Sequence, residues 1–164
     1  MRPPPVLDPA QDPRAFRDAL GQFATGVTLV TAQGAAGPVG ITANSFASLS
    51  LEPPLVLWSV ALSSSRAQTF IEADHFAIHV LSADQERIAR AFAARADAFA
   101  DVPPRESPRS VPLIDGCLAH FECEREAVHP GGDHALIIGR VVEMAVKPGT
   151  PLIFAGGTFG TPAR

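Results

Sequence analysis

The sequence predicts a mainly β protein, in which a closed or nearly closed β-barrel is flanked by a few helices. Short apolar or β-branched runs of strand length recur along the chain, and glycine or proline separates most of them. The clearest run is 117–127, where apolar residues fill most odd positions and Glu122, Glu124 and Glu126 face the other way. Alternation with a period of two is typical of a strand with one buried face. Many short strands with few helices favour a barrel.

The first half of the chain is expected to form one helix and four strands. Asp12 and Pro13 are a favourable helix start, and Phe16, Leu20 and Phe23 then give the helix an apolar face. The strands are expected at 26–32, 39–43, 46–51 and 55–61. The last of these is almost entirely apolar, which predicts burial on both of its faces.

The second half is expected to contribute two helices and the remaining strands. Each helix begins with a capping box, the first at Ser65–Gln68, ending near residue 73, and the second at Ser82–Gln85. The segment 102–112 is rich in proline, serine and charge and is predicted to be an exposed loop. Strands are expected at 75–81, 117–127, 135–146 and 152–155, with a hairpin turn at 130–133.

Composition limits the classes of function. With 164 residues, of which 46% are hydrophobic and 18% charged, the chain should fold as one domain, residues 12–164, behind a flexible arm at 1–11. A net charge of −4 offers no basic stripe for a phosphate backbone, which argues against nucleic acid as a partner. No membrane span or signal peptide is evident, so a cytoplasmic protein is expected. High apolar content with low charge fits a homo-oligomer.

Metal sites and several common enzyme motifs are not expected. The sequence has no dinucleotide-binding, P-loop, zinc-protease or hydrolase signature. His75 and His79 would lie roughly 13 Å apart on a strand, too far to share one ion, and a structural role for one buried histidine is favoured. Cys117 and Cys123 would lie roughly 20 Å apart on another strand, which excludes a disulfide and fits reduced, buried thiols.

Three polar segments are candidates for a binding site. Thr42–Ser45 combines a small residue with hydroxyls and an amide, and this suits either the edge of a flat polar ring or an ordinary turn. Ser59 and the run Ser63–Arg66 precede a predicted helix start, where serines could cap the helix or bind a phosphate with Arg66. Capping explains one serine but not the row, which favours a phosphate site. At Gly131–His134, turn chemistry alone is the preferred explanation.

Five segments form a recognisable set in this order: Phe23-Ala-Thr-Gly-Val-Thr-Leu-Val-Thr31, Gly40-Ile-Thr-Ala-Asn-Ser-Phe46, Ser50-Leu-Glu-Pro-Pro-Leu-Val56, Phe76-Ala-Ile-His-Val-Leu81 and Gly132-Asp-His134. Together they resemble the short-chain flavin reductases, the NAD(P)H:flavin oxidoreductase components of two-component monooxygenases. The resemblance extends over residues 14 to 160. It implies an FMN-binding split barrel, usually a homodimer with the flavin near the subunit boundary.

The resemblance also implies roles for individual residues. The flavin ring and ribityl chain would lie along Thr42, Ala43, Asn44 and Ser45, with Ser48 as a further neighbour. The phosphate end would be held by Ser59, Ser63, Ser65 and Arg66. Phe99 matches an aromatic often found near the flavin, and His134 would act on the nicotinamide side of the pocket as the catalytic residue. The chain departs from the usual pattern at His79, where asparagine is frequent, and at Phe159, where tyrosine often closes the site.

The implied activity is hydride transfer from NADH or NADPH to FMN or FAD, with the reduced flavin diffusing to a partner monooxygenase. The two cofactors supply this chemistry, so the protein needs mainly to orient their rings. Two alternatives remain at this point. The same fold could retain FMN and reduce another acceptor, such as a cobalt corrinoid or a quinone, or it could be a non-catalytic protein that binds flavin or haem.

Overall fold

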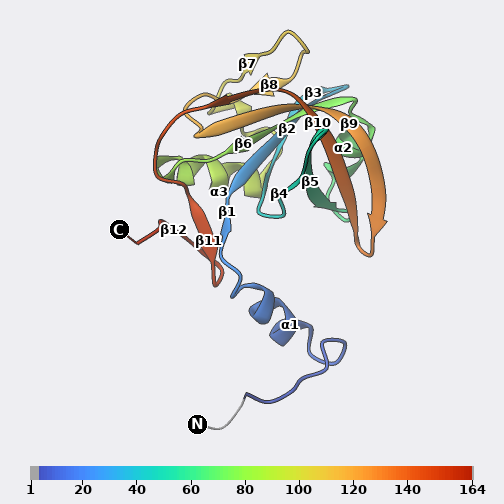
Figure 1. Ribbon diagram of the computed structural model, residues 1–164, viewed down its shortest axis with the longest axis vertical. Coiled ribbons are helices and arrows are strands. Elements are labelled where there is room, and N and C mark those ends of the chain that lie inside the picture. The colour runs from blue at the N-terminus through green and yellow to red at the C-terminus, as the bar shows by residue number, and fades with distance from the viewer. Residues whose placement is uncertain (1–3, 164) are drawn as a thin grey trace.

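The computed structural model describes residues 4–163 and confirms the predicted mainly β fold. A seven-stranded antiparallel sheet, in the order β3-β2-β6-β9-β10-β5-β4, curves around one core (Figure 1). Its strands are β2 (Thr28–Gly34), β3 (Gly37–Ala43), β4 (Ala47–Leu51), β5 (Pro54–Ala61), β6 (His75–Val80), β9 (Ala119–Gly131) and β10 (His134–Val146). The expected arm at 1–11 lies partly outside the described residues, because nothing is described for residues 1–3.

The interior of the barrel is filled by aromatic and branched side chains from strands on opposite walls. Trp58 on β5 packs edge-on against Phe70, with ring centroids 5.0 Å apart, and lies 6.3 Å from the ring of Phe76 on β6. All three side chains are almost completely buried. Phe70 belongs to α2 (Ala67–Glu72), so this short helix contributes to the same core as the strands.

A second layer covers the outer side of β2 and β3. It consists of η1 (Ala83–Gln85), α3 (Glu86–Ala94) and η2 (Ala98–Ala100). Phe92 and Phe99 pack edge-on, with centroids 4.8 Å apart, in an apolar cluster with Leu29 of β2. A Cβ at Gly40 of β3 would lie 2.6 Å from the Phe92 ring, so only glycine lets α3 approach this closely.

Two expectations about burial hold only in part, and both differences have the same cause. In β5 only alternate residues are buried, Val56, Trp58 and Val60, because the strand belongs to an antiparallel barrel whose outer face is partly solvated. The expected exposed loop at 102–112 instead contains the short strand β7 (Arg105–Glu106) and leads into β8 (Pro112–Leu113), and its Ser107 and Val111 are buried. In each case tertiary packing, not local polarity, determines burial.

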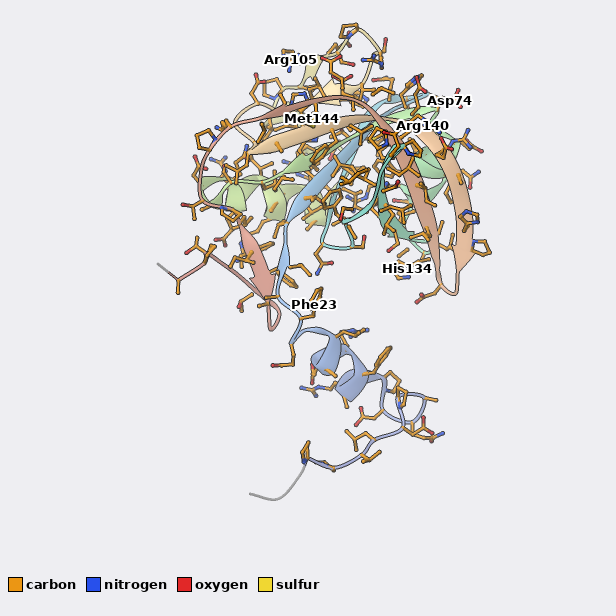
Figure 2. All side chains as sticks on the ribbon, in the orientation of Figure 1. Phe23, Asp74, Arg105, His134, Arg140 and Met144 are labelled. Atoms are coloured by element: carbon orange, nitrogen blue, oxygen red, sulfur yellow. The ribbon has the colours of Figure 1, made fainter. Side chains whose placement is uncertain are left out.

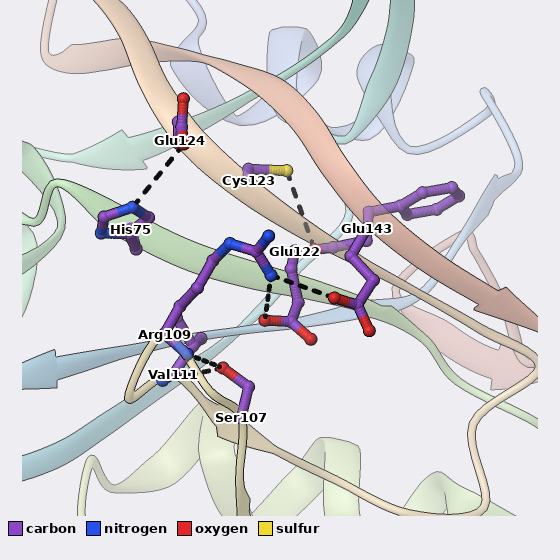
Figure 3. Close-up of polar contacts among 9 residues, drawn as sticks. His75, Ser107, Arg109, Val111, Glu122, Cys123, Glu124 and Glu143 are labelled. Atoms are coloured by element: carbon purple, nitrogen blue, oxygen red, sulfur yellow. Dashed lines mark hydrogen bonds and ion pairs between the residues drawn. The ribbon is translucent and has the colours of Figure 1, made fainter.

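The loop at 102–112 covers the side chain of Glu122. Its side chain points away from the barrel core, as the alternation predicts, yet it is only 1% exposed because the loop lies over it. Nη1 of Arg109 lies 3.8 Å from the Glu122 carboxylate and donates to Glu143 at 3.0 Å (Figure 3). Ser107 Oγ accepts from the backbone N–H groups of Arg109 and Val111, which holds the loop in shape.

The N-terminal helix stands away from the barrel (Figure 1). It is α1 (Pro13–Leu20), and Asp12 caps it as predicted, since its carboxylate accepts from the Ala15 N–H at 2.9 Å. No α1 side chain is buried. The chain then forms β1 (Thr25–Gly26), which pairs with the C-terminal hairpin of β11 (Ile153–Ala155) and β12 (Thr158–Gly160). In the described range, no helix has the length and apolar character needed to span a membrane.

Candidate functional site

The three predicted polar segments meet at one end of the barrel. The first spans the end of β3, the second begins on β5, and the third is the turn that joins β9 to β10. His134 pairs directly with Ala61 at the end of β5, and the Leu62 N–H donates to the Asp133 carbonyl at 2.9 Å. Figure 2 shows His134 at the tip of the hairpin and Phe23 where α1 leaves the barrel, both at the end away from Arg105. The antiparallel register therefore gathers residues that are far apart in sequence.

In the first segment each side chain has a different environment. Thr42 Oγ1 donates to the Ala89 carbonyl of α3 at 2.6 Å, while Ala43 packs against the barrel core. Asn44 is exposed. The Ser45 hydroxyl donates to the Ser59 carbonyl and accepts from the Ser59 N–H, both at 3.0 Å. Asn44 is thus the member whose side chain has solvent access, and its neighbours hold the backbone in place.

Two adjoining cavities open beside Asn44. The larger, of about 650 Å³, lies between the end of α1, Phe23, Phe154 and the turn at 156–157. The smaller, of about 190 Å³, is lined by Val27, Thr42, Ala43, Asn44, Ala93, Phe154 and Phe159. Asn44 and Phe154 belong to both walls. A concave, largely apolar site with a few polar groups is the usual setting for a planar ligand, and the larger cavity is in the size range of such sites.

The C-terminal hairpin supplies an aromatic wall that sequence reasoning only partly anticipated. Phe154 and Phe159 pack edge-on, with centroids 5.2 Å apart, and the Arg90 guanidinium lies 4.8 Å from the Phe159 ring centre. Phe159 stands where the resemblance often has a tyrosine that closes the site. Phe154 and the end of α1 are not among the predicted site residues. The available signal was the Gly156-Gly157 turn, whose positive φ angles of 56° and 80° fold β12 back onto β11.

The serine run forms a loop rather than a helix cap. Ser63 and Ser65 are exposed, and Ser64 Oγ accepts from the Arg66 N–H at 3.3 Å. The predicted capping box at Ser65–Gln68 is wrong, because α2 begins at Ala67 and has no side-chain cap. Ser64 instead closes a tight turn before the helix. The capping box at Ser82–Gln85 is confirmed and starts η1, which leads into α3.

Arg66 reaches across to β3 and α3. Its Nη1 donates to the Phe92 carbonyl at 2.6 Å and to the Gly40 carbonyl at 3.1 Å, and its Nη2 lies 3.4 Å from the Ala93 carbonyl. Burial lowers the pKa of Arg66 from its ordinary value, although the group stays charged. The guanidinium therefore links the serine loop to the wall of the smaller cavity.

His134 is held by its neighbour in sequence. Its Nδ1 lies 2.7 Å from Asp133 Oδ1, and the hydrogen bond from His134 is the main cause that lowers the pKa of the Asp133 carboxyl. With Nδ1–H donating to the carboxylate, Nε2 remains as the outward-facing nitrogen of a half-exposed ring. Gly132 supports this turn with a φ angle of 70°, in the region that favours glycine.

Of the predicted site residues, Thr42, Ala43 and Asn44 line the two cavities and the others do not. Ser48 is exposed on β4 opposite Val56, and Phe99 is buried behind Gly40.

The histidine with a structural role is His79, which is fully buried. Its Nδ1 lies 3.0 Å from the Leu29 carbonyl, and its Nε2 accepts from the Ile114 N–H at 3.1 Å. Within residues 4–163, no three His, Cys, Asp or Glu side chains come together as a metal site. Both cysteines are free thiols.

The chain is similar to proteins of known activity. Residues 20–163 match the family model of the flavin reductase like domain. The FMN reductase (NADH) SmoA of Agrobacterium fabrum is 54% identical over 154 residues, which cover 94% of this chain and 88% of the relative. The HsaB reductase subunit of a flavin-dependent monooxygenase from Rhodococcus jostii is 41% identical, with coverage of 94% and 80%.

A solved structure has the same fold. The NADH:FAD oxidoreductase SgcE6 of Streptomyces globisporus C-1027, in complex with NAD and FAD fragments, aligns with a TM-score of 0.91 and 40% identity over 98% of each chain. This chain spans about half the length of two further curated relatives, 49% of one and 52% of the other.

Proposed function

This chain belongs to the flavin reductase-like domain family, and on that premise we propose that it is an NADH-dependent flavin reductase that supplies reduced FMN or FAD to a separate flavin-dependent monooxygenase. The observation that carries the proposal is that a cleft opens beside Asn44, whose neighbour Ser45 is hydrogen-bonded to Ser59 of β5. The end of the same strand pairs with His134 and leads into the serine loop. These features give a flavin a flat wall for its ring and hydroxyl donors for its phosphate.

The donor set fits an uncharged ring with an anionic tail. We assign the ring and ribityl chain to Thr42, Ala43, Asn44 and Ser45, because Asn44 can donate and accept at the ring edge while Ala43 leaves room for close approach. The phosphate end is assigned to the hydroxyls of Ser59, Ser63 and Ser65, beside the guanidinium of Arg66. Ser48 and Phe99 are kept as outer neighbours of the site. Ser63 and Ser65 are exposed hydroxyls able to donate to phosphate oxygens.

The protein's own part in the reaction is to orient the reactants and limit their contact with water. Flavin and dihydronicotinamide supply the hydride transfer themselves when bound. Asn44 fixes the ring edge, and Phe154 with Phe159 gives the smaller cavity an apolar wall that excludes water. His134 is assigned to the nicotinamide side, where Nε2 can hold a carboxamide because Asp133 fixes the ring through Nδ1.

NADH is the proposed donor because relatives and a solved structure that carry NADH in their names share the fold and much of the sequence. FMN and FAD are both retained as acceptors, since they share the ring and the first phosphate. Departure of the reduced flavin is consistent with a site made of modest polar contacts. Two free cysteines agree with a reducing cytoplasm.

We further propose that the working unit, residues 12–164 behind the arm at 1–11, is a homodimer. Phe16, Leu20 and Phe23 are 50%, 60% and 77% exposed, although the sequence gives α1 an apolar face. Contiguous apolar surface of this kind is normally covered by another protein. The larger cavity lies against the end of α1, so a partner seated there would border the flavin site.

Anaerobic oxidation of NADH with FMN, FAD and riboflavin, compared side by side, tests the activity. We expect NADH consumption that depends on added flavin, and transfer of the reduced flavin to an unrelated flavin-dependent oxygenase present in the same reaction. A yellow protein that retains its flavin through turnover would favour reduction of another acceptor. Absence of NADH oxidation with all three flavins would contradict the proposal and leave only a binding role.

A further inference from the structure

We propose that Arg66 is a positioning residue, which fastens the serine loop to β3 and α3, and that it does not bind the flavin phosphate directly. The inference rests on the proposed flavin reductase function and assigns a role within that site. It concerns the only side chain in the serine run that carries a charge. A charged residue next to serines would ordinarily be taken as a phosphate ligand, and the geometry of the guanidinium points elsewhere.

The guanidinium is already engaged by backbone oxygens. Both N–H groups of Nη1 are used, one by the Phe92 carbonyl at 2.6 Å and one by the Gly40 carbonyl at 3.1 Å. Nη2 lies 3.4 Å from the Ala93 carbonyl. A guanidinium has five N–H donors in a fixed plane, so these three contacts determine how the whole group is oriented.

Two of the three acceptors are carbonyls that a helix leaves without partners. Phe92 and Ala93 are in the last turn of α3, where backbone oxygens have no N–H four residues ahead within the helix. The helix dipole also places partial negative charge at this end, which favours a cation. Arg66 therefore caps the C-terminus of α3 from a distant segment of the chain. It donates hydrogen bonds to helix carbonyls that would otherwise bind water.

This contact joins two parts of the proposed flavin site. Ala93 lines the smaller cavity beside Asn44, and Thr42 is bonded to Ala89 of the same helix. Ser63 and Ser65 lie immediately before Arg66 in the chain. Fixing the guanidinium on α3 thus sets the position of the serine hydroxyls relative to the ring-binding wall. Without it, the loop would keep its turn contacts, such as Ser64 Oγ to the Arg66 N–H, and the hydrogen bond from the Leu62 N–H to the hairpin, but no contact to α3 through Arg66.

Riboflavin separates the two roles because it has the ring and ribityl chain but no phosphate. A direct phosphate ligand affects only FMN, whereas loss of the fastening also moves the α3 wall that borders the ring, and so affects both compounds. For Arg66→Met we expect the dissociation constant of FMN to rise by a factor of about ten, since charge-assisted hydrogen bonds are lost. The dissociation constant of riboflavin should rise at least about threefold, because the α3 wall moves even when no phosphate is bound. Flavin fluorescence under titration with protein measures both constants.

Arg66→Lys provides a second variant that keeps the charge but lacks the planar fork. Positioning predicts that it too weakens both flavins, while a phosphate contact predicts nearly normal FMN binding. Arg87→Met is the matched control, because Arg87 is an exposed arginine on α3, the helix that Arg66 contacts. The inference would be overturned if the Arg66 variants bound only FMN more weakly, or if both variants bound FMN and riboflavin as tightly as the wild type.

Hydrogen exchange supplies a readout that needs no flavin. Arg66→Met should speed exchange in peptides covering 62–66 and the end of α3 near Arg95, and Arg87→Met should not. Unchanged exchange would overturn the inference even in an active reductase. A wild-type protein that does not bind FMN or riboflavin and does not oxidise NADH would instead contradict the proposed function. Arg66 would then have no role in flavin binding. The exchange result would still show whether Arg66 holds the serine loop against α3.

Discussion

The hydroxyl of Ser45 satisfies both backbone groups of Ser59, donating to its carbonyl and accepting from its N–H at 3.0 Å each. Ala47 of β4 pairs with Leu57 of β5, so Ser45 lies two residues further along the same register, opposite Ser59. The backbone has already turned away towards β3 at this point. The Ser45 side chain therefore takes the place of the backbone hydrogen bonds that a continued β4 strand would make to Ser59. The backbone at Asn44 can then leave the sheet and border the cleft.

Ser45→Ala should destabilise the protein by about 1–3 kcal/mol, because two part-buried backbone groups of Ser59 lose their partner. The single tryptophan, Trp58, lies on the same strand and reports unfolding in urea. The same variant should also raise the KM for FMN, since Asn44 loses its anchor. Ser110→Ala, at an exposed position in the loop before β8, is the control. An unchanged urea midpoint would show that the bridge does not hold the site.

Protonation of His79 should lower stability in mild acid. Burial, the largest cause, lowers the pKa of His79 from 6.5 to about 4. Nε2 accepts from the Ile114 N–H. A proton on Nε2 would therefore place two N–H donors face to face and remove this hydrogen bond. The unfolded chain binds the proton near pH 6.5 and the folded chain only near pH 4. Stability is therefore complete above pH 6.5 and falls as the pH drops towards 4, by an amount on the order of 3 kcal/mol.

The measurement is the free energy of unfolding in urea at several pH values between 7 and 4. Acidic residues also titrate in this range, so the informative quantity is the difference between wild type and His79→Gln. The glutamine can still bond to the Leu29 carbonyl but cannot take up a proton. The wild-type curve should be steeper than that of the variant. Parallel curves would mean that His79 does not govern the acid response.

The pair Arg109–Glu122 should behave as a buried charge and its counter-ion. Arg109→Met would leave the Glu122 carboxylate, 1% exposed, without the guanidinium that lies 3.8 Å away, and should cost about 2–3 kcal/mol. Adding Glu122→Gln to that variant should recover much of the loss, because the uncompensated charge is removed. Urea unfolding of the two single variants and the double variant measures the coupling. Purely additive changes in the free energy of unfolding would contradict this coupling between Arg109 and Glu122.

Dimer formation through α1 predicts a response to charge on its apolar face. Leu20→Asp should raise the dimer dissociation constant at least about tenfold, since a 60% exposed leucine that becomes buried contributes about 1.5–3 kcal/mol. Sedimentation over a range of protein concentrations measures the constant. Arg14→Asp, at an exposed position in the first turn of the helix, is the control. A wild-type protein that stays monomeric at all concentrations would contradict the homodimer.

The strands were predictable because their signals are local. Alternation at 117–127 and the glycine turn at 130–133 specify a hairpin whatever the rest of the chain does. Burial was less predictable where another segment decides it. Nothing near Glu122 reveals that the loop carrying Arg109 lies over it, and nothing in the apolar run of β5 reveals that one of its faces is partly solvated.

The candidate site could be proposed from the sequence as a set of segments but not as a set of contacts. The order of the strands brings Ser59 and His134 to one end, and the sequence resemblance already grouped them. The side-chain roles depend on distant partners, as with Arg66 on the Phe92 carbonyl and Thr42 on the Ala89 carbonyl. Phe154 gave no signal, because a phenylalanine in a short strand has the same pattern whether it faces a core or a cleft.

Replacement of His134 tests the nicotinamide side of the site. The ring is half exposed and is held through Nδ1 by Asp133, so His134→Ala should leave stability nearly unchanged. It should raise the KM for NADH about three- to tenfold, because one hydrogen bond contributes about 0.5–1.5 kcal/mol. The dissociation constant of FMN should change little, since the assigned flavin contacts lie on β3, β5 and the serine loop.

Two further variants identify the cause of such a change. Asp133→Asn keeps an oxygen acceptor for Nδ1–H and should give a smaller rise in the KM for NADH than His134→Ala. His129→Ala, on the neighbouring strand of the same hairpin, should leave the constant unchanged. Steady-state kinetics with NADH as the varied substrate measures all three. Equal effects of His129→Ala and His134→Ala would indicate a general disturbance of the hairpin, and unchanged kinetics in His134→Ala would remove this residue from the site.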